Sequence, residues 1–497
     1  MKMIFIQQQI KQIRSGGLLA LRRKMRGFPG WFLWWFVTSK YGVRAAYYGS
    51  RIGVLLMPRW AGVHVLLARV LISMGRFDEA FTVWERAFRL KPDWPGVYNR
   101  VQNAFFFCGQ TYAARNVMQR ILNARNDFAR EHQLDKMGMR FLCEWTHAIG
   151  HLALLDSYVK MDKLGWRSKD RPVLLVQQVV ANPCYLEYWR RYLPDMITDP
   201  LTLKLVSPFA KYLEDPIFVV KDSSGRQNMG QDYGGAVLHA SIQAQWDIEG
   251  RSPLLILSEV DHERGWQCLR RLGVPADAWF VSLHVREGQT ESRGARDADI
   301  AAYRMAIESI VKRGGWVIRM GDPYMTPLPP MPQVIDYAHS QDRCDWMDVF
   351  LWARCRFFIG TQSGPAWVPP TFGIPCVATN WTLFSRRWYK QDLCIPKLVW
   401  SEKENRYLPF AEVLASGIGD VESVKYLDSK GIRIVNNTAE EINDVVIEMI
   451  DRLEGNLIYS DRDNELQKHF DIVWPGNPYK INARIGREFL IKWEQLL

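Results

Sequence analysis

One segment, from Phe280 to Gly373, constrains the fold of this chain more than any other. It begins with Phe280-Val-Ser-Leu-His-Val-Arg286, where apolar residues stand on both sides of His284 and a polar loop follows. Such a run is typical of a buried parallel strand, and the carboxyl ends of parallel strands are where open α/β sheets bind ligands. We therefore expect His284 and Arg286 to reach a binding site at that end of the strand.

The rest of this segment alternates between helical and strand patterns. Helices are predicted at 300–312, before the glycine stop Gly314-Gly315, and at 345–353, and strands at 316–322 and 356–360. A strand that is followed in turn by helix, strand, helix and strand predicts a mononucleotide-binding half-fold of an α/β protein.

A turn of small and hydroxyl residues, Thr361-Gln-Ser-Gly-Pro-Ala366, follows the last of these strands. Pro365 would occupy the first position of a helix, and the free backbone N–H groups at a helix start bind phosphate. Arg286 is suited to clamp a diphosphate through two parallel hydrogen bonds. The sequence thus predicts a site for a leaving diphosphate. The residues expected on the turn's side of it are Gly360, Thr361, Gln362, Ser363 and Gly364.

The same residues resemble a known family. His284-x-Arg286, Gly321-Asp322, Asp348 and Phe358-Ile-Gly-Thr361-x-Ser363 are similar, in order and approximate spacing, to the motifs of fucosyltransferase-like glycosyltransferases. Residues 280–382 more closely resemble a bacterial glycosyltransferase family of surface-polysaccharide loci. The resemblance implies a GT-B fold, in which two Rossmann-like domains face each other across a cleft and the C-terminal one binds a nucleotide-sugar donor.

The resemblance also implies individual roles. Arg286 would hold the β-phosphate, His284 and Asp348 would approach the base and ribose, and Thr361, Ser363 and Gly364 would line the phosphates. The fucosyltransferases often carry paired hydroxyl residues where this chain has Ser363-Gly364. The resemblance favours a GDP-sugar as the donor, and this departure means that the donor need not be GDP-fucose.

Other polar residues near these motifs are candidates for further roles. Arg319, Gly321 and Asp322 end the second strand and are expected at the donor, although Asp322 could instead simply begin the following loop. A base must accept the proton of the acceptor hydroxyl. The candidates for it are Glu287, Asp297 and Asp232.

Asp297-Ala-Asp299 could be mistaken for a metal-binding Asp-x-Asp motif. It directly precedes the helix predicted at 300–312, where carboxylates cap the free backbone N–H groups. We therefore expect no metal and no other cofactor. The eight cysteines include no C-x-x-C pair, which argues against a zinc site and a disulfide framework and favours a cytoplasmic setting.

The positive charge of the chain lies near its beginning. Residues 1–77 contain thirteen Lys and Arg and no acidic residue, whereas the remainder is slightly negative, so the net charge of +11 does not indicate a nucleic-acid partner. A basic cluster at 14–26 leads into an aromatic run at 28–37 that is too short to span a membrane. Residues 1–58 are predicted to be an arm that binds an anionic inner-membrane surface, unless the aromatic run packs on the protein.

A helical repeat is predicted after the arm. Gly75, Ala80, Trp84, Ala87 and Pro92 match the tetratricopeptide pattern, and Gly109 and Ala114 repeat part of it 34 residues later. Residues 59–168 are therefore expected to form an all-α region, which would either bind a protein partner or be purely structural.

The remaining boundaries complete the predicted organisation. Apolar runs at 172–176, 217–220 and 254–257 predict a first, acceptor-side Rossmann-like domain over 169–273. The donor domain would cover 274–460 and include a helix capped by Thr438 and Glu441, followed by a helical tail over 461–497.

These observations predict a metal-independent, inverting glycosyltransferase. It would move a sugar from a nucleotide-sugar donor to a glycan or lipid-linked acceptor at the cytoplasmic membrane face. Two alternatives remain open at this stage: a nucleotide-sugar epimerase, and a tetratricopeptide-type scaffold whose nucleotide-binding domain has no catalytic activity.

Overall fold

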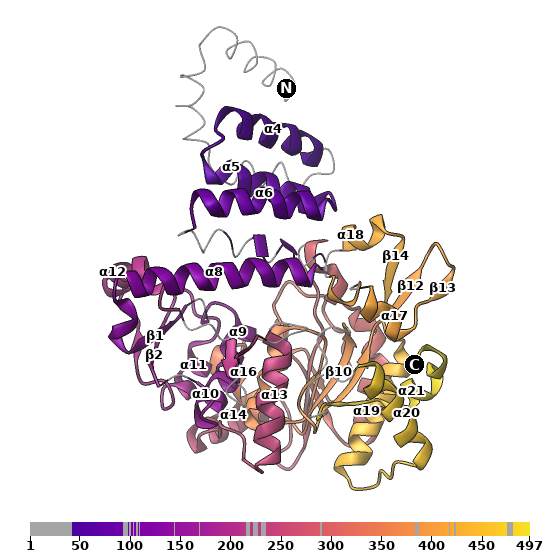
Figure 1. The fold of residues 1–497 in the computed structure, drawn as a ribbon. Helices are drawn as coiled ribbons and strands as arrows, with labels where there is room; N and C mark the ends of the chain where they lie inside the picture. The colour runs from indigo at the N-terminus through magenta and orange to yellow at the C-terminus, as the bar shows by residue number, and fades with distance from the viewer. Residues whose placement is uncertain are drawn as a thin grey trace, which may run out of the picture. The chain divides into compact units, whose positions relative to one another are not determined.

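The computed structural model describes most of the chain from Gly42 onward and divides it into two compact units, Met1–Phe105 and Phe106–Leu497 (Figure 1). Residues 1–41 of the arm predicted at 1–58, and the predicted base Asp232, lie outside the described residues. Further residues that are not described are 93–97, 99–100, 103, 106–107, 109, 144, 168, 215–218, 222–226, 230–234, 289–290, 383–386, 417, 422–423 and 475–480.

The described part of the first unit is helical. Its long helices are α4 (Gly42–Leu56), α5 (Ala61–Ser73) and α6 (Phe77–Leu90). Gly75, with φ of 73°, makes the turn between α5 and α6, and Ala80, Trp84 and Ala87 are fully buried on one face of α6. The predicted helix–turn–helix is therefore confirmed, whereas its assignment to the tetratricopeptide class remains a prediction.

A seven-stranded parallel sheet is the centre of the second unit. Its order is β15-β11-β10-β9-β6-β7-β8, so the first strand of the set, β6, lies between β7 and β9. The chain thus winds first to one side of β6 and then to the other, and ligands in such sheets bind at this reversal. The strands are β6 (Phe280–His284), β7 (Trp316–Arg319), β8 (Val334–Ile335), β9 (Phe358–Gly360), β10 (Cys376–Trp381), β11 (Leu393–Pro396) and β15 (Arg484–Ile485).

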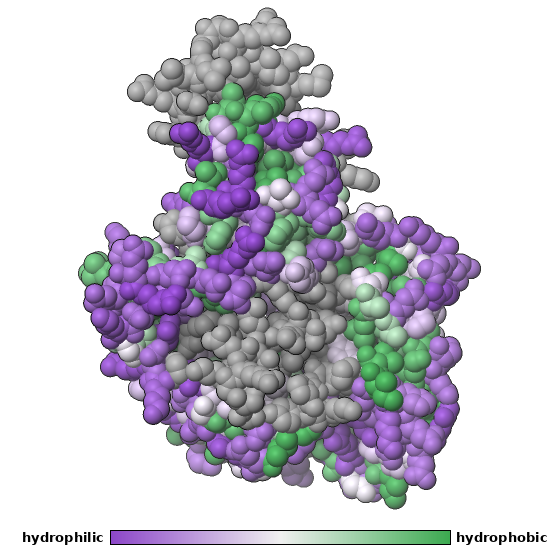
Figure 2. Space-filling view, in the orientation of Figure 1, coloured by the Kyte–Doolittle hydropathy of each residue, from purple (hydrophilic) through white to green (hydrophobic). Residues whose placement is uncertain are grey.

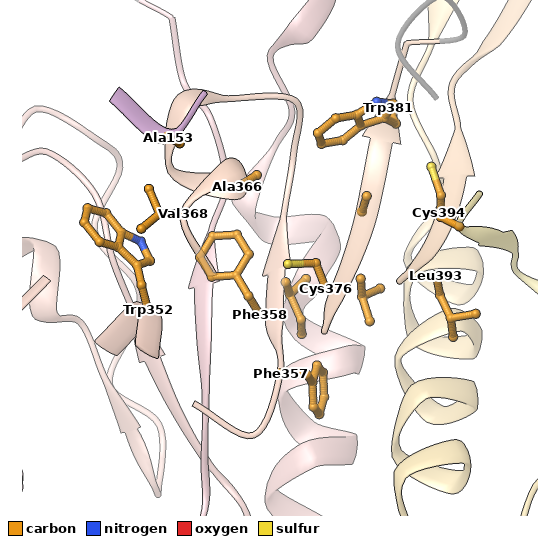
Figure 3. Close-up of a cluster of buried hydrophobic side chains, with 14 of the residues drawn as sticks. Ala153, Trp352, Phe357, Phe358, Ala366, Val368, Cys376, Trp381, Leu393 and Cys394 are labelled. Atoms are coloured by element: carbon orange, nitrogen blue, oxygen red, sulfur yellow. The ribbon is translucent and has the colours of Figure 1, made fainter. Parts of the chain in front are cut away.

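Helices cover this sheet and complete its core. α15 (Arg304–Lys312) packs against α19 (Ala439–Leu453), and α14 (Glu259–Arg271) packs against α16 (Asp345–Arg354). All residues of β6, β9, β10 and β11 are buried, as expected for parallel strands covered on both faces. Figure 3 shows the side chains from β9, β10 and β11 that meet in this core.

The predicted elements of this domain are largely confirmed. The helix predicted at 300–312 consists of a short 3₁₀ helix, η3 (Ile300–Tyr303), continued by α15. The Thr438–Glu441 capping box is formed, and it begins α19 where the sequence indicated. The predicted tail contains α20 (Asp461–Val473) and α21 (Arg487–Lys492), both of which pack on the donor-side core.

A smaller parallel sheet precedes the large one in the second unit. It consists of β1 (Met139–Leu142), β2 (Arg171–Leu175) and β3 (Met196–Ile197) in that order. The prediction for 172–176 is confirmed, but β1 lies in the range that was expected to be helical. The alternation in Met-Arg-Phe-Leu is only four residues long, so the pattern is too short to reveal a strand.

Two apolar runs that were predicted to belong to the sheet of this first domain do not pair with it. Leu254–Leu257 forms no strand: Leu254 and Leu255 are buried, and the Leu255 N–H donates to the Thr371 carbonyl at 3.1 Å. The apolar run therefore reflects packing on the large domain. Of the run at 217–220 the structure describes Val219 and Val220, which belong to β4 (Val219–Lys221), and β4 pairs antiparallel with β5 (Gln227–Met229) in a separate two-stranded sheet.

Other helices and strands surround these two sheets. No described helix is both long enough and apolar enough to cross a membrane. The five-part division of the chain into domains remains a prediction. Further elements include α8 (Thr111–Glu131), η1 (Leu134–Met137), α9 (Ile149–Ala153), α10 (Leu155–Lys163), α11 (Pro183–Trp189), α12 (Pro200–Ala210), α13 (Gly235–Ile248), β12 (Leu398–Ser401), β13 (Arg406–Tyr407), α17 (Phe410–Ala415), α18 (Val424–Ser429) and β14 (Ile432–Val435).

The packing of α14 on α16 depends on a glycine. A methyl group at Gly265 would lie 2.0 Å from the ring of Phe350, which is itself fully buried. Gly265→Ala should therefore lower the free energy of unfolding by about 1–3 kcal/mol through overpacking, measured by chemical denaturation. Gln267→Ala, an exposed change on the same helix, is the control and should stay within about 0.5 kcal/mol of the native protein. Equal stability of the two variants would show that α14 does not pack in this way.

Candidate active site

The candidate site is built where β6 and β9 lie side by side. His284 pairs with Gly360 in the parallel ladder, and the Thr361 N–H donates to the His284 carbonyl at 3.3 Å. The Arg286 N–H donates to the Thr361 hydroxyl at 2.9 Å, and the Ser363 hydroxyl lies 3.2 Å from Nδ1 of His284. The two motifs that are separated by some 75 residues in the sequence are thus held together by hydrogen bonds.

The turn after β9 presents unsatisfied hydrogen-bond donors. Among the described residues, no hydrogen-bond acceptor pairs with the backbone N–H groups of Gln362, Ser363 and Gly364. Gln362 and Ser363 are buried, and buried backbone N–H groups are nearly always paired. The side chain of Gln362 does not fill this role, since its oxygen accepts from the Thr382 N–H at 3.1 Å. Three adjacent unpaired N–H groups therefore form a potential anion site.

The turn does not begin an α-helix, which corrects the expectation from Pro365. It continues as two short 3₁₀ helices, η5 (Gly364–Trp367) and η6 (Pro369–Phe372). Pro365, Pro369 and Pro370 have no N–H group to continue a helical ladder. A helix dipole therefore contributes little, and an anion here would depend on the individual N–H groups.

Gly364 is required by close contact with the smaller domain. A methyl group at residue 364 would lie 2.7 Å from Cγ2 of Ile149 and 2.8 Å from the Gly150 nitrogen. The short helix α9, which follows β1, therefore presses directly on the turn. This contact explains why a second hydroxyl residue after Ser363 would not fit.

Arg286 extends beside the turn and is held by one carboxylate. Its Nε donates to Oδ1 of Asp297 at 2.9 Å, and among the described residues its two terminal nitrogens have no hydrogen-bond partner. Asp297 is fixed in turn by tight packing, because a methyl group at Gly288 would lie 2.3 Å from its Oδ2. The terminal nitrogens of Arg286 can therefore form the two parallel bonds that a phosphate accepts.

The predicted capping role divides between two aspartates. Asp299 caps η3 by accepting from the Ala301 N–H at 2.9 Å, as expected. Asp297 does not cap the helix, because its carboxylate pairs with Arg286. The stronger charge-assisted bond to a guanidinium replaces the bond to a backbone N–H.

Lys397 is a buried cation next to this pair that the sequence did not indicate. Its Nζ donates to the Asp297 carbonyl at 2.6 Å, and the side chain is 3% exposed. Burial lowers the pKa of Lys397 to about 8, although the charge of Asp297 opposes this shift. The residue lies just after β11, far from the motifs in sequence, so neither spacing nor composition could identify it.

His284 contributes no charge to the site near neutral pH. Burial, and then the charges of Arg319 and Arg286, lower the pKa of His284 to about 4. The neutral imidazole can exchange a hydrogen bond with Ser363 at Nδ1. The positive charge for binding an anion therefore comes from Arg286.

Arg319 and Glu287 belong to a closed network behind the site. The fully buried Arg319 donates to Asp336 at 3.0 Å and to the Thr326 carbonyl at 3.0 Å, and its NH2 lies 3.5 Å from Glu287. Glu287 accepts from both the N–H and the hydroxyl of Thr326, at 2.8 and 2.7 Å. This geometry indicates that both residues hold in place the proline-rich loop at 323–333, between β7 and β8, instead of contacting a substrate.

The remaining predicted residues lie around the ends of β7 and β8. Gly321, with φ of 151°, is required by packing, because a methyl group there would lie 2.4 Å from the Met325 sulfur. Asp322 is exposed and lies 3.8 Å from Arg343. Burial raises the pKa of Asp348 to about 7, and the nearby charges include that of Asp322. Asp348 lies in the first turn of α16, close enough to Asp322 for their charges to interact.

The facing surface of the smaller domain carries two histidines that the sequence analysis missed. His147 and His151 follow β1, and their rings lie 5.0 Å apart at 83°. Gln177, which follows β2, accepts from the Thr146 N–H at 2.8 Å and places its Nε2 3.2 Å from Nδ1 of His147. His151 directly follows Gly150, which contacts Gly364, so the backbone of His151 lies near the turn. The spacing His-x-x-x-His was the only sequence signal.

The described residues contain no group of three or more His, Cys, Asp or Glu that could hold a metal ion. Asp297, the residue closest to a metal-binding motif, has Arg286 as its partner.

No protein family and no curated protein matches this chain. A glycosyl transferase family 9 protein from Veillonella parvula resembles it with 12% identity and a TM-score of 0.37, over 64% of this chain and 97% of its own. TibC, an iron-containing dodecameric glycosyltransferase from enterotoxigenic E. coli, has 15% identity and a TM-score of 0.34, over 64% and 76%. A Thermobaculum terrenum O-GlcNAc transferase has 13% identity and a TM-score of 0.25, over 91% and 90%. At these scores the likeness establishes neither the fold nor the activity of this chain.

The buried network predicts that Arg319 acts on stability. Arg319→Met would leave Asp336 and Glu287 without their cation and should lower the free energy of unfolding by about 3–5 kcal/mol. Arg304→Met is the control: Arg304 is exposed and pairs with Glu308 at 2.9 Å, so its loss should cost about 0–1 kcal/mol. Chemical denaturation measures both. If Arg319→Met kept native stability but lost nucleotide binding, Arg319 would be a ligand-contacting residue instead.

Proposed function

We propose that this chain is a glycosyltransferase whose donor is a nucleoside-diphosphate sugar. The proposal rests on two sets of donors that lie close together and have no partner among the described residues: the backbone N–H groups of residues 362–364 and the terminal nitrogens of Arg286. Donors of these two kinds, close together at the reversal point of a parallel sheet, suit the two phosphates of a diphosphate. The resemblance of the surrounding motifs to fucosyltransferase-like enzymes supports the same assignment.

The reaction would proceed by a single displacement. An acceptor hydroxyl attacks the anomeric carbon, the bond from that carbon to the β-phosphate oxygen breaks, and the diphosphate leaves with the bonding electrons. Arg286 and the N–H groups of the turn would stabilise the negative charge that develops on the leaving group. In this mechanism no metal ion is needed for that charge. The family resemblance favours a GDP-sugar as the donor.

The base that accepts the acceptor's proton is best sought on the smaller domain. Glu287 is bonded to Thr326, and Asp297 is paired with Arg286. His151 is exposed, adjoins Gly150 at the turn, and has His147 beside it. We assign His151 as the proton acceptor and His147, oriented by Gln177, as the residue that positions it. A single displacement by the acceptor hydroxyl would invert the configuration of the anomeric carbon.

The proposed acceptor and cellular location rest on the family resemblance and on the basic aromatic arm. A surface-polysaccharide precursor or other glycoconjugate, either glycan or lipid-linked, would suit the family resemblance. The basic aromatic arm predicted at 1–58 supports work at the cytoplasmic membrane face. The helices of the first unit could bind a protein partner.

The role of Arg286 is tested by its removal. Arg286→Ala should lower transfer about 10²–10³-fold, since a donor to the developing charge is lost, and it should abolish the thermal shift by nucleoside diphosphates. The native protein is first screened for melting-temperature shifts with GDP, UDP, ADP and dTDP to choose the nucleotide, and Arg304→Ala is the matched surface control. A native protein that bound none of these nucleotides would favour the scaffold alternative, and full activity of Arg286→Ala would refute the site.

The proposed base is tested separately from donor binding. His151→Asn should reduce transfer about 10²–10⁴-fold while leaving the nucleotide-induced thermal shift intact, because it removes only the proton acceptor. His147→Asn should reduce transfer less. His469→Asn, an exposed histidine at the end of α20, is the control. Native turnover in His151→Asn would exclude the assignment, and an epimer formed from the donor without acceptor would indicate an epimerase instead.

A further inference from the structure

Helix α4 packs with its small residues inward and its large residues outward. Its buried residues are Gly42, Ala46, Ser50 and Gly53. A methyl group at Gly53 would lie 3.2 Å from Cγ1 of Val63 on α5, so these small residues let the two helices approach closely. Amphipathic helices of globular domains normally bury their large apolar side chains instead.

Large apolar side chains of α4 are left exposed. Tyr48 is 64% exposed, Ile52 is 55% exposed and Leu55 is 77% exposed. They are spaced at i, i+4 and i+7 and therefore share one face of the helix. Figure 2 shows apolar atoms at the surface of this unit next to strongly hydrophilic ones. We call the five residues Arg44, Tyr48, Arg51, Ile52 and Leu55 the outer face of α4.

The charge on this face is entirely positive. Arg44 and Arg51 are exposed among the apolar side chains, and Arg51 donates to the Tyr47 hydroxyl at 3.2 Å. No acidic residue occurs before Asp78 in the sequence. A helix with arginines beside Tyr, Ile and Leu is typical of one that lies in the headgroup region of an anionic bilayer.

We propose that the outer face of α4 docks on an anionic phospholipid membrane, with Tyr48, Ile52 and Leu55 inserted at the boundary of headgroups and acyl chains. Electrostatic attraction would bring Arg44 and Arg51 to the lipid phosphates, and apolar burial would then hold the helix. Helix α4 lies within residues 1–58, the segment that the sequence predicted to bind an anionic membrane. A membrane-docked α4 places the chain where a lipid-linked acceptor would lie, but the docking itself does not require the proposed transferase activity.

The binding test uses the full chain with two kinds of vesicle. Vesicles of phosphatidylcholine alone and of phosphatidylcholine with phosphatidylglycerol are compared by flotation. The Tyr48→Ser/Ile52→Ser/Leu55→Ser variant should bind anionic vesicles about tenfold or more weakly than the native chain, and Arg44→Gln/Arg51→Gln should lose the preference for anionic lipid. Ile458→Ser/Ile472→Ser is the matched control, since these residues are 87% and 76% exposed on the second unit. Unchanged binding by the triple variant would overturn the proposal.

A fluorescent probe on α4 distinguishes membrane binding by this face from membrane binding by residues 1–41. An environment-sensitive fluorophore attached to Ile52→Cys, with the signal from labelled native cysteines subtracted, should shift to the blue only when anionic vesicles are added. A probe that is already in an apolar environment without vesicles, or that never responds, would mean that another part of the chain or a second copy covers the face, and it would overturn the proposal. The nucleotide-induced thermal shift of each variant is measured in parallel, so failure of the membrane proposal is distinguishable from failure of the transferase proposal.

Discussion

The parallel pairing of β6 with β9 is the interaction on which the candidate site depends. The register sets Leu283 against Ile359 and His284 against Gly360, so the motifs leave the sheet at the same level. Beyond the last paired residues of the two strands, the Arg286 N–H donates a hydrogen bond to the Thr361 hydroxyl, which continues to hold the two segments together. A slip of one residue would turn every side chain of the shifted strand to the opposite face of the sheet and would separate the guanidinium from the turn. Burial of both strands makes such a slip costly.

Close contacts at glycines then bring the smaller domain against the turn that follows β9. Gly364 and Gly150 let α9 approach the turn more closely than any side chain would permit, and Gly288 lets Asp297 approach Arg286. The result is a cation and a set of amides on the large domain, with a pair of histidines on the small one. The proposed mechanism gives leaving-group stabilisation to groups of the large domain and proton acceptance to a histidine of the small one. Helix α4 belongs to the other unit, and its proposed docking on a membrane is independent of this site.

The sequence predicted the large domain well and the small one poorly, for physical reasons. Strands buried on both faces produce apolar runs such as Phe280–Val285, and capping residues such as Thr438 mark helix starts locally. In contrast, β1 is four residues long, and the apolar run at 254–257 is explained by contact with Thr371. His284, Arg286, Thr361 and Ser363 were brought together as predicted. Lys397 and the His147–His151 pair were missed because their proximity to the turn is created only by tertiary packing. The closed network of Arg319 and Glu287 likewise depends on Thr326, a contact that no local pattern encodes.

The central claim is that the N–H groups of residues 362–364 bind a diphosphate together with Arg286. The most direct measurement is the amide proton shift of Gln362, Ser363 and Gly364 in selectively ¹⁵N-labelled protein, recorded while a nucleoside diphosphate is added and again with the corresponding nucleoside. The account predicts that all three amide protons move downfield with the diphosphate and stay in place with the nucleoside, because only phosphate oxygens accept their hydrogen bonds. A diphosphate that binds this protein while these three resonances remain unchanged would contradict it.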